Sequence, residues 1–119
     1  MFEKWALDGS SIKTLPNDFP DIQNICFEPP FSAFRPEDKT PFVGMLVIVY
    51  KPDKLLLEFS SFHDWLKQRS AMEISIEGFT QLVFDVLKER LDPQYLHITF
   101  KSETQTLAAV SCQISYFSA

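Results

Sequence analysis

A helical repeat of apolar residues in the second half of the chain fixes the order of the elements on either side of it. Ser75 stands before the repeat as the expected N-cap, and Glu77 follows in the first turn, where a carboxylate favours the helix macrodipole. Asp92-Pro93 ends the repeat. The sequence therefore predicts an amphipathic helix over Ile76–Leu91. The apolar residues that share its buried face are Phe79, Leu82, Val83, Val86, Leu87 and Leu91.

Two stretches before this helix and two after it have the pattern of β-strands. Phe42–Tyr50 is continuously apolar and rich in β-branched residues, which predicts a strand buried on both faces or held at a subunit contact. Turn-forming residues 51–54 lead into Leu55–Phe59, the predicted returning strand of a hairpin. After the helix, Tyr95–Lys101 and Thr106–Phe117 alternate between apolar and polar residues, as half-buried strands do.

A second, shorter helix is expected between the hairpin and the long helix. Ser61 is its predicted N-cap, with Asp64 three residues later in a weak capping-box pattern. Phe62, Trp65 and Leu66 then share one helical face. The order strand, strand, helix, helix, strand, strand predicts an α+β domain in which a four-stranded antiparallel sheet carries two helices on one face (ββααββ).

The chain of 119 residues is expected to form a single domain, with an irregular N-terminal segment over 1–41 and the core over 42–117. The N-terminal segment holds six of the eight prolines, which remove a backbone donor and resist helix interiors. A short strand is expected there at Ile25–Phe27.

Composition and charge argue against several classes of function. The net charge is −5 without a cluster of lysine or arginine, which argues against nucleic-acid binding. No signal peptide is recognised in residues 1–20, and the longest apolar run is too short to cross a membrane. Cys26 and Cys112 lack the C-x-x-C spacing and are expected to be reduced thiols in a cytoplasmic protein. His63 is expected at the surface and His97 on the polar face of a strand. These two histidines and the two distant cysteines form no ligand cluster, so no metal site is predicted.

The open edges of a four-stranded sheet suggest an assembly. Proteins rarely leave such edges bare, and long apolar strands favour pairing with other subunits, so that a ring of sheets closes a barrel. This order of elements resembles the tunnelling fold, the family of GTP cyclohydrolase I, dihydroneopterin aldolase and 7-cyano-7-deazaguanine reductase (QueF). The resemblance implies a homo-oligomer with binding sites at its interfaces.

Short motifs resemble the QueF-like family in particular. Y-K-P-D at Tyr50–Asp53, Glu58, Ile76-Glu77 and Asp92–Tyr95 fall on the family pattern, without a gap from Glu58 to Pro93. Residues 30–36 resemble the segment around the nucleophilic cysteine of the family. The chain is therefore identified as a degenerate member of the NADPH-dependent 7-cyano-7-deazaguanine reductase family, whose products serve queuosine synthesis in tRNA modification.

The resemblance implies chemistry for which this chain lacks residues. Family members add a cysteine thiolate to a nitrile, and NADPH reduces the thioimide in two hydride steps. Here Arg35, or Phe34 in another placement of the gap, stands where the nucleophile falls, and Thr40-Pro41 stands where the general acid falls. Ile76 replaces the histidine of the family, and the lysines of its cofactor motif are absent. Loss of nitrile reduction is expected.

Glu58 and Glu77 match the two glutamates that contact the 7-deazaguanine base in the family. A carboxylate accepts two parallel N–H bonds from a purine-like or pterin-like ring. Three hypotheses follow: a divergent protein that binds such a ring through both glutamates, an active NADPH-dependent reductase with Cys26 as a displaced nucleophile, or a structural or regulatory subunit without a small-molecule site. In the last case Glu58 faces solvent and Glu77 only favours the helix dipole.

Overall fold

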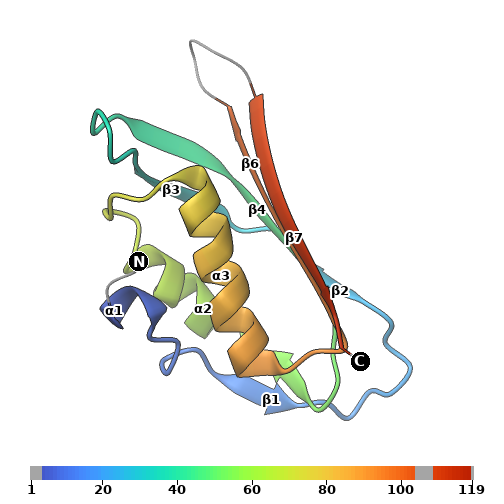
Figure 1. Ribbon diagram of the computed structural model, residues 1–119. Helices are drawn as coiled ribbons and strands as arrows, with labels where there is room; N and C mark the ends of the chain where they lie inside the picture. The colour runs from blue at the N-terminus through green and yellow to red at the C-terminus, as the bar shows by residue number, and fades with distance from the viewer. Residues whose placement is uncertain (1–3, 104–108, 119) are drawn as a thin grey trace.

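The structure, a computed structural model, describes residues 4–103 and 109–118, and it combines antiparallel sheets with helices in an α+β fold (Figure 1). The elements in chain order are α1 (Lys4–Leu7), β1 (Thr14–Pro16), β2 (Ile25–Phe27), β3 (Pro30–Phe34), β4 (Pro41–Lys51), β5 (Leu55–Leu57), α2 (Phe59–Lys67), α3 (Ile76–Leu91), β6 (Tyr95–Glu103) and β7 (Ala109–Phe117).

A five-stranded antiparallel sheet is built around β4. Its strands follow the order β2-β4-β6-β7, and β3 also pairs with β4. β2 and β3 lie one after the other along one side of β4, and β6 lies along the other side. Helices α2 and α3 cover one face of this sheet, as predicted, and the opposite face carries no helix (Figure 1). The strand at Ile25–Phe27 is confirmed, whereas β3 arises in a segment that was expected to be irregular.

The predicted hairpin between β4 and β5 is wrong. β5 is only three residues long and pairs with β1 in a separate two-stranded sheet. The hydroxyl of buried Tyr50, on the core-facing side of β4, accepts the N–H of Leu57 (3.0 Å). This bond holds β5 against the helix-covered face of the main sheet and not at its edge. β2 and β3 occupy the side of β4 that the hairpin would have used, which replaces the expected four-stranded sheet by one of five strands.

The long helix α3 has the bounds that the sequence predicts. Its N-cap is Ser75, whose hydroxyl accepts the N–H of Gly78 (2.9 Å), and Asp92 ends it in a left-handed conformation (φ 44°). The N-cap of α2 is Glu58, and the predicted cap Ser61 lies within the helix. The glutamate side chain bends over the first turn and accepts the free N–H groups of Ser60 and Ser61.

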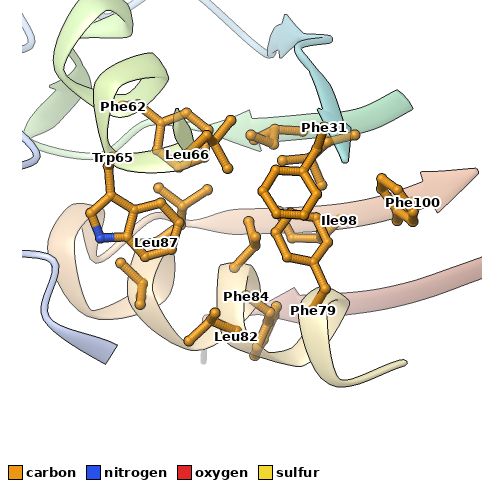
Figure 2. Packing of buried hydrophobic residues seen from close by; sticks show 14 of the residues in the cluster. Phe31, Phe62, Trp65, Leu66, Phe79, Leu82, Phe84, Leu87, Ile98 and Phe100 are labelled. Carbon is orange, nitrogen blue, oxygen red and sulfur yellow. The ribbon is translucent and has the colours of Figure 1, made fainter. Parts of the chain in front are cut away.

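The core lies between the main sheet and the two long helices and is rich in aromatic rings (Figure 2). Phe31 of β3 stacks on Phe79 of α3 with ring centroids 3.8 Å apart, and Phe100 of β6 meets Phe79 edge-on at 5.2 Å. Phe62 and Trp65 stack within α2 at 5.7 Å. Such ring pairs add about 0.5–1.5 kcal/mol each beyond the area they bury, so much of the phenylalanine content serves the core.

β4 is buried on one face only within a single subunit. Its core-facing residues are buried, whereas Val43 and Met45 on the other face are 61% and 41% exposed. The strand β6 alternates as predicted, with Leu96, Ile98 and Phe100 buried. In β7, Cys112, Ile114 and Tyr116 lie on one face of the predicted alternation and are half-buried, while Val110 on the same face is exposed. Residues 106–108 of the predicted strand lie outside the described residues. No helix among the described residues is long and apolar enough to span a membrane.

A buried arginine fastens α1 to α2. Arg69 is 2% exposed and donates to the backbone carbonyls of Trp5, Ala6 and Asp8. Its guanidinium also lies over the ring of Trp65, 3.9 Å from the centroid. Burial lowers the pKa of Arg69. The N-terminal segment therefore belongs to the fold and is not a loose extension.

Candidate functional site

A pocket of about 360 Å³ opens where β1, β2, β5 and the start of α2 meet, and Glu58 lies at its edge. Leu15 of β1 and Phe59 of α2 line the same pocket and are 49% and 43% exposed. Ile25 and Tyr50 form further parts of the wall. A pocket that combines a carboxylate with exposed apolar side chains suits a flat ring with N–H donors.

The carboxylate of Glu58 is held by the backbone of α2. Its oxygens accept the N–H groups of Ser60 and Ser61, and Glu58 itself has extended backbone angles (φ −86°, ψ 115°). A carboxylate has about four lone-pair positions, so acceptor capacity remains for a ligand. The structure thus gives Glu58 a capping role, which differs from both roles that the sequence suggested.

Ser61 joins the N-terminal segment to this site. Its hydroxyl donates to the Glu58 carbonyl (3.0 Å) and accepts the N–H of Lys13 (2.8 Å). The N–H of Glu58 donates in turn to the Lys13 carbonyl (3.0 Å). These bonds place Leu15 against the pocket. Sequence reasoning missed both Ser61 and Leu15 as site residues, because only the tertiary structure brings the two segments together.

Glu77 and Glu58 lie at opposite ends of α3. Glu77 is exposed in the first turn, whereas Arg90 in the last turn donates to the carbonyl of Ile12, next to the Lys13 carbonyl that binds Glu58. Figure 1 shows β1 beside the C-terminal end of α3. The helical rise between Glu77 and Arg90 amounts to roughly 20 Å. One subunit therefore does not bring the two glutamates into one pocket.

The neighbourhood of Glu77 includes a cysteine and the loop at Arg35. Burial, and to a lesser extent the charge of Glu77, raises the pKa of the Cys112 thiol. β3 is tied to the segment before α3, since the N–H of Phe34 donates to the Met72 carbonyl and the N–H of Ile74 donates to the Phe34 carbonyl. The position where the resemblance expects a nucleophile thus lies at the Glu77 end of the subunit.

The loop that contains Arg35 is held by its own charges. The Nε of Arg35 lies 3.7 Å from a carboxylate oxygen of Glu37 and of Asp38. Asp38 accepts both the side-chain hydroxyl and the N–H of Thr40, and these hydrogen bonds lower its pKa. Lys39 pairs with Glu73 from a left-handed turn (φ 61°). Asp38 is consequently a charged acceptor at neutral pH and a poor proton donor.

Cys26 lies on the opposite face of the main sheet from the Glu58 pocket. It is exposed and pairs with Val49, whose side chain points away from the helices. Its neighbour Ile25 points toward the helices and lines the Glu58 pocket. The thiol and the carboxylate therefore do not face a common space within one subunit.

The two histidines differ in exposure and in hydrogen bonding. His63 is exposed on α2, as predicted. His97, on the helix-free face, bonds the Ser115 hydroxyl through Nδ1 and the Thr99 hydroxyl through Nε2 (2.9 Å). Within the part of the chain that the structure describes, no group of three His, Cys, Asp or Glu residues could hold a metal ion.

Comparisons with known proteins bear on the family. No family model matches the chain. Over 95 residues the chain is 27% identical to the NADPH-dependent 7-cyano-7-deazaguanine reductase of Aquifex aeolicus (strain VF5), which covers 77% of the chain and 73% of that protein. The crystal structure of the archaeosine synthase QueF-Like in the apo form matches with a TM-score of 0.74 and 18% identity, over 80% of this chain and 94% of that one. The sequence match, together with this match in fold, confirms the resemblance that the motifs indicate, to the QueF-like family.

Proposed function

We propose that this protein is a divergent QueF-family subunit of the tunnelling fold that binds a purine-like or pterin-like ring through Glu58 and Glu77. The observation that carries the proposal is the Glu58 carboxylate, which α2 fixes at a pocket that exposed Leu15 and Phe59 also line. A guanine-like edge offers a ring N–H beside an amino group, which matches the two oxygens of one carboxylate. The apolar side chains would cover the faces of the ring.

The separation of the two glutamates supports a site between copies. A ring bound by both must lie where Glu58 of one subunit approaches Glu77 of another, because within one chain they lie at opposite ends of α3, a helix roughly 20 Å long. β7 supports such an assembly: it pairs with β6 on one side only among the described residues. Its nine residues include no proline or charged residue, the usual protections of a free edge. We therefore propose a homo-oligomeric barrel in the cytoplasm.

Nitrile reduction is absent from the proposed function. The guanidinium of Arg35 cannot attack a nitrile, and Asp38 is held in its charged form. NADPH is the cofactor named for the Aquifex relative, and it would enter here only if Cys26 served as a displaced nucleophile. The position of Cys26 on the helix-free face argues against that alternative within one subunit.

Thermal-shift and calorimetric titrations with guanine, 7-deazaguanines and pterins test ring binding. We expect at least one ring to stabilise the protein, and Glu58→Gln to weaken its binding about tenfold or more, since a charged acceptor is lost. The glutamine retains an oxygen for the helix cap, so the fold is kept. Glu89→Gln, an exposed glutamate on α3, is the matched control. If none of the rings binds, the site proposal is wrong and the subunit is structural or regulatory.

A second experiment separates binding from catalysis. The protein is mixed with 7-cyano-7-deazaguanine, and the thioimide absorbance and NADPH consumption are followed. We expect neither signal. A signal that Cys26→Ser abolishes would instead establish the reductase alternative, and a dispersed monomer in solution at working concentration would contradict the proposed barrel.

A further inference from the structure

A second pocket, of about 640 Å³, lies on the helix-free face at the end of the main sheet. The end of β4, the start of β6, the end of β7 and the loop before β2 surround it. Its size is within the range of small-molecule sites. The strand residues that line it, Val49, Lys51, Tyr95 and Phe117, alternate with core residues, so the sheet separates this pocket from the one at Glu58.

Aromatic rings form one wall of this pocket. Lys51, Tyr95 and Phe117 are cross-strand neighbours in one row of the sheet. The rings of Tyr95 and Phe117 are tilted, with centroids 4.7 Å apart, and Phe117 is 72% exposed. Tyr95 also lies parallel to the ring of His97 at 6.4 Å. An exposed ring on a supported aromatic row is a surface on which another planar ring can stack.

The charge of the pocket is opposite to that of the chain. The protein has a net charge of −5, yet no carboxylate lines this pocket in the described ranges. Lys51 is half-buried in its wall and forms no ion pair with a described residue. The amides of Gln23, Asn24 and Gln94 complete the rim, and the Nε2 of Gln94 donates to the Asp53 carboxylate (3.4 Å), which lies outside the lining.

The frame of the pocket is held by backbone bonds. The N–H of Gln94 donates to the Lys51 carbonyl (3.0 Å), and the N–H of Ser118 donates to the Gln94 carbonyl (3.0 Å).

We infer that this pocket is a binding site for a planar aromatic ring that carries a single carboxylate or phosphate group. The ring stacks on Phe117 and Tyr95, and the anionic group pairs with Lys51. This site is independent of the ring site proposed at Glu58.

Amide-detected NMR titration of the full chain with adenosine monophosphate tests the inference. Adenine lacks the paired N–H and amino edge that Glu58 would accept, so this probe avoids the other pocket. We expect shifts to concentrate at residues 49–51, 94–95 and 117–118. Adenosine and ribose 5-phosphate each keep one half of the probe, and each should bind at least about tenfold more weakly than adenosine monophosphate.

Two variants and one control make the test specific. Lys51→Gln should reduce affinity for adenosine monophosphate to that for adenosine, and Phe117→Ala should weaken both ligands. Lys101→Gln changes an exposed lysine on the same sheet face and should have no effect. The inference is overturned if the probe gives no shifts at 10-fold excess over about 1 mM protein. It is also overturned if the shifts map to Leu15 and Phe59, or if Lys101→Gln weakens binding as much as Lys51→Gln.

Discussion

Replacing Arg69 by methionine should be among the most destabilising changes in this protein. The side chain is 2% exposed and donates to the carbonyls of Trp5, Ala6, Asp8 and Trp65 at 2.6–3.1 Å. Methionine fills a similar volume but offers no donor, so three carbonyls near the end of α1 lose this partner. Their loss also releases the segment that leads to Leu15 at the Glu58 pocket.

The magnitude follows from the balance of these bonds against burial of the charge. Hydrogen bonds to a charged group contribute about 1.5–3 kcal/mol each before the desolvation of the guanidinium is subtracted. Each buried acceptor that loses its partner costs about 1–3 kcal/mol. We therefore expect Arg69→Met to lower the free energy of unfolding by about 3–4 kcal/mol, out of a total of roughly 5–15 kcal/mol for a domain of this kind.

Urea unfolding followed by tryptophan fluorescence measures this loss directly, because both tryptophans, Trp5 and Trp65, lie against Arg69. With a denaturant slope of about 2 kcal/mol per molar, the midpoint should fall by roughly 1.5–2 M. Lys67→Met, an exposed change at the end of α2 and two residues before Arg69, should stay within about 0.5 kcal/mol of the wild type. If Arg69→Met costs no more than this control, the clamp does not stabilise the fold and our reasoning about the N-terminal segment is wrong.

Four further changes give separate readouts. Burial raises the pKa of Tyr50, so the stability that its protonated hydroxyl contributes is present below pH 10 and is lost as the pH rises above it. Tyr50→Phe should lower the free energy of unfolding by about 1 kcal/mol at neutral pH, because the hydrogen bond from the Leu57 N–H is lost. The variant should also show a smaller fall in this free energy at alkaline pH. Thr40→Val removes the hydroxyl donor to Asp38, so the carboxyl pKa measured by ¹³C NMR should rise toward 3.8, and an unchanged value would refute the assignment. Gly44→Ala places a Cβ 2.3 Å from a carbonyl of β6 and should cost about 1–3 kcal/mol. Gly78→Ala meets its nearest atom, the Ser75 hydroxyl, at 3.0 Å, so thermal unfolding should show it near neutral.

The parts of the fold that the sequence predicts well are those with local causes. α3 has an apolar repeat, a serine cap and a proline stop, all within one stretch of chain, and its bounds are confirmed. β6 alternates along its own length and is likewise confirmed. The partner of β5 had no such signal. Its pairing with β1 depends on the hydroxyl of Tyr50 and on a segment distant in sequence, and a hairpin was the simplest local alternative.

The candidate site shows the same division. The motif positions of Glu58 and Glu77 were apparent from sequence order, whereas their placement at opposite ends of α3 needed the structure. Glu58 as a helix cap was missed because Ser61 offered the more usual capping residue. Leu15 carried no signal at all, since an apolar residue among prolines has no periodic partner.

The length of α3 has a consequence for how the proposed sites are counted. A subunit that presents one glutamate at each end contributes half of a site to each of two neighbours. An open row of such subunits contains one complete site fewer than it has copies, while a closed ring has as many sites as copies. A ligand that needs both glutamates would therefore favour closure of the ring by mass action, and its apparent affinity would depend on protein concentration.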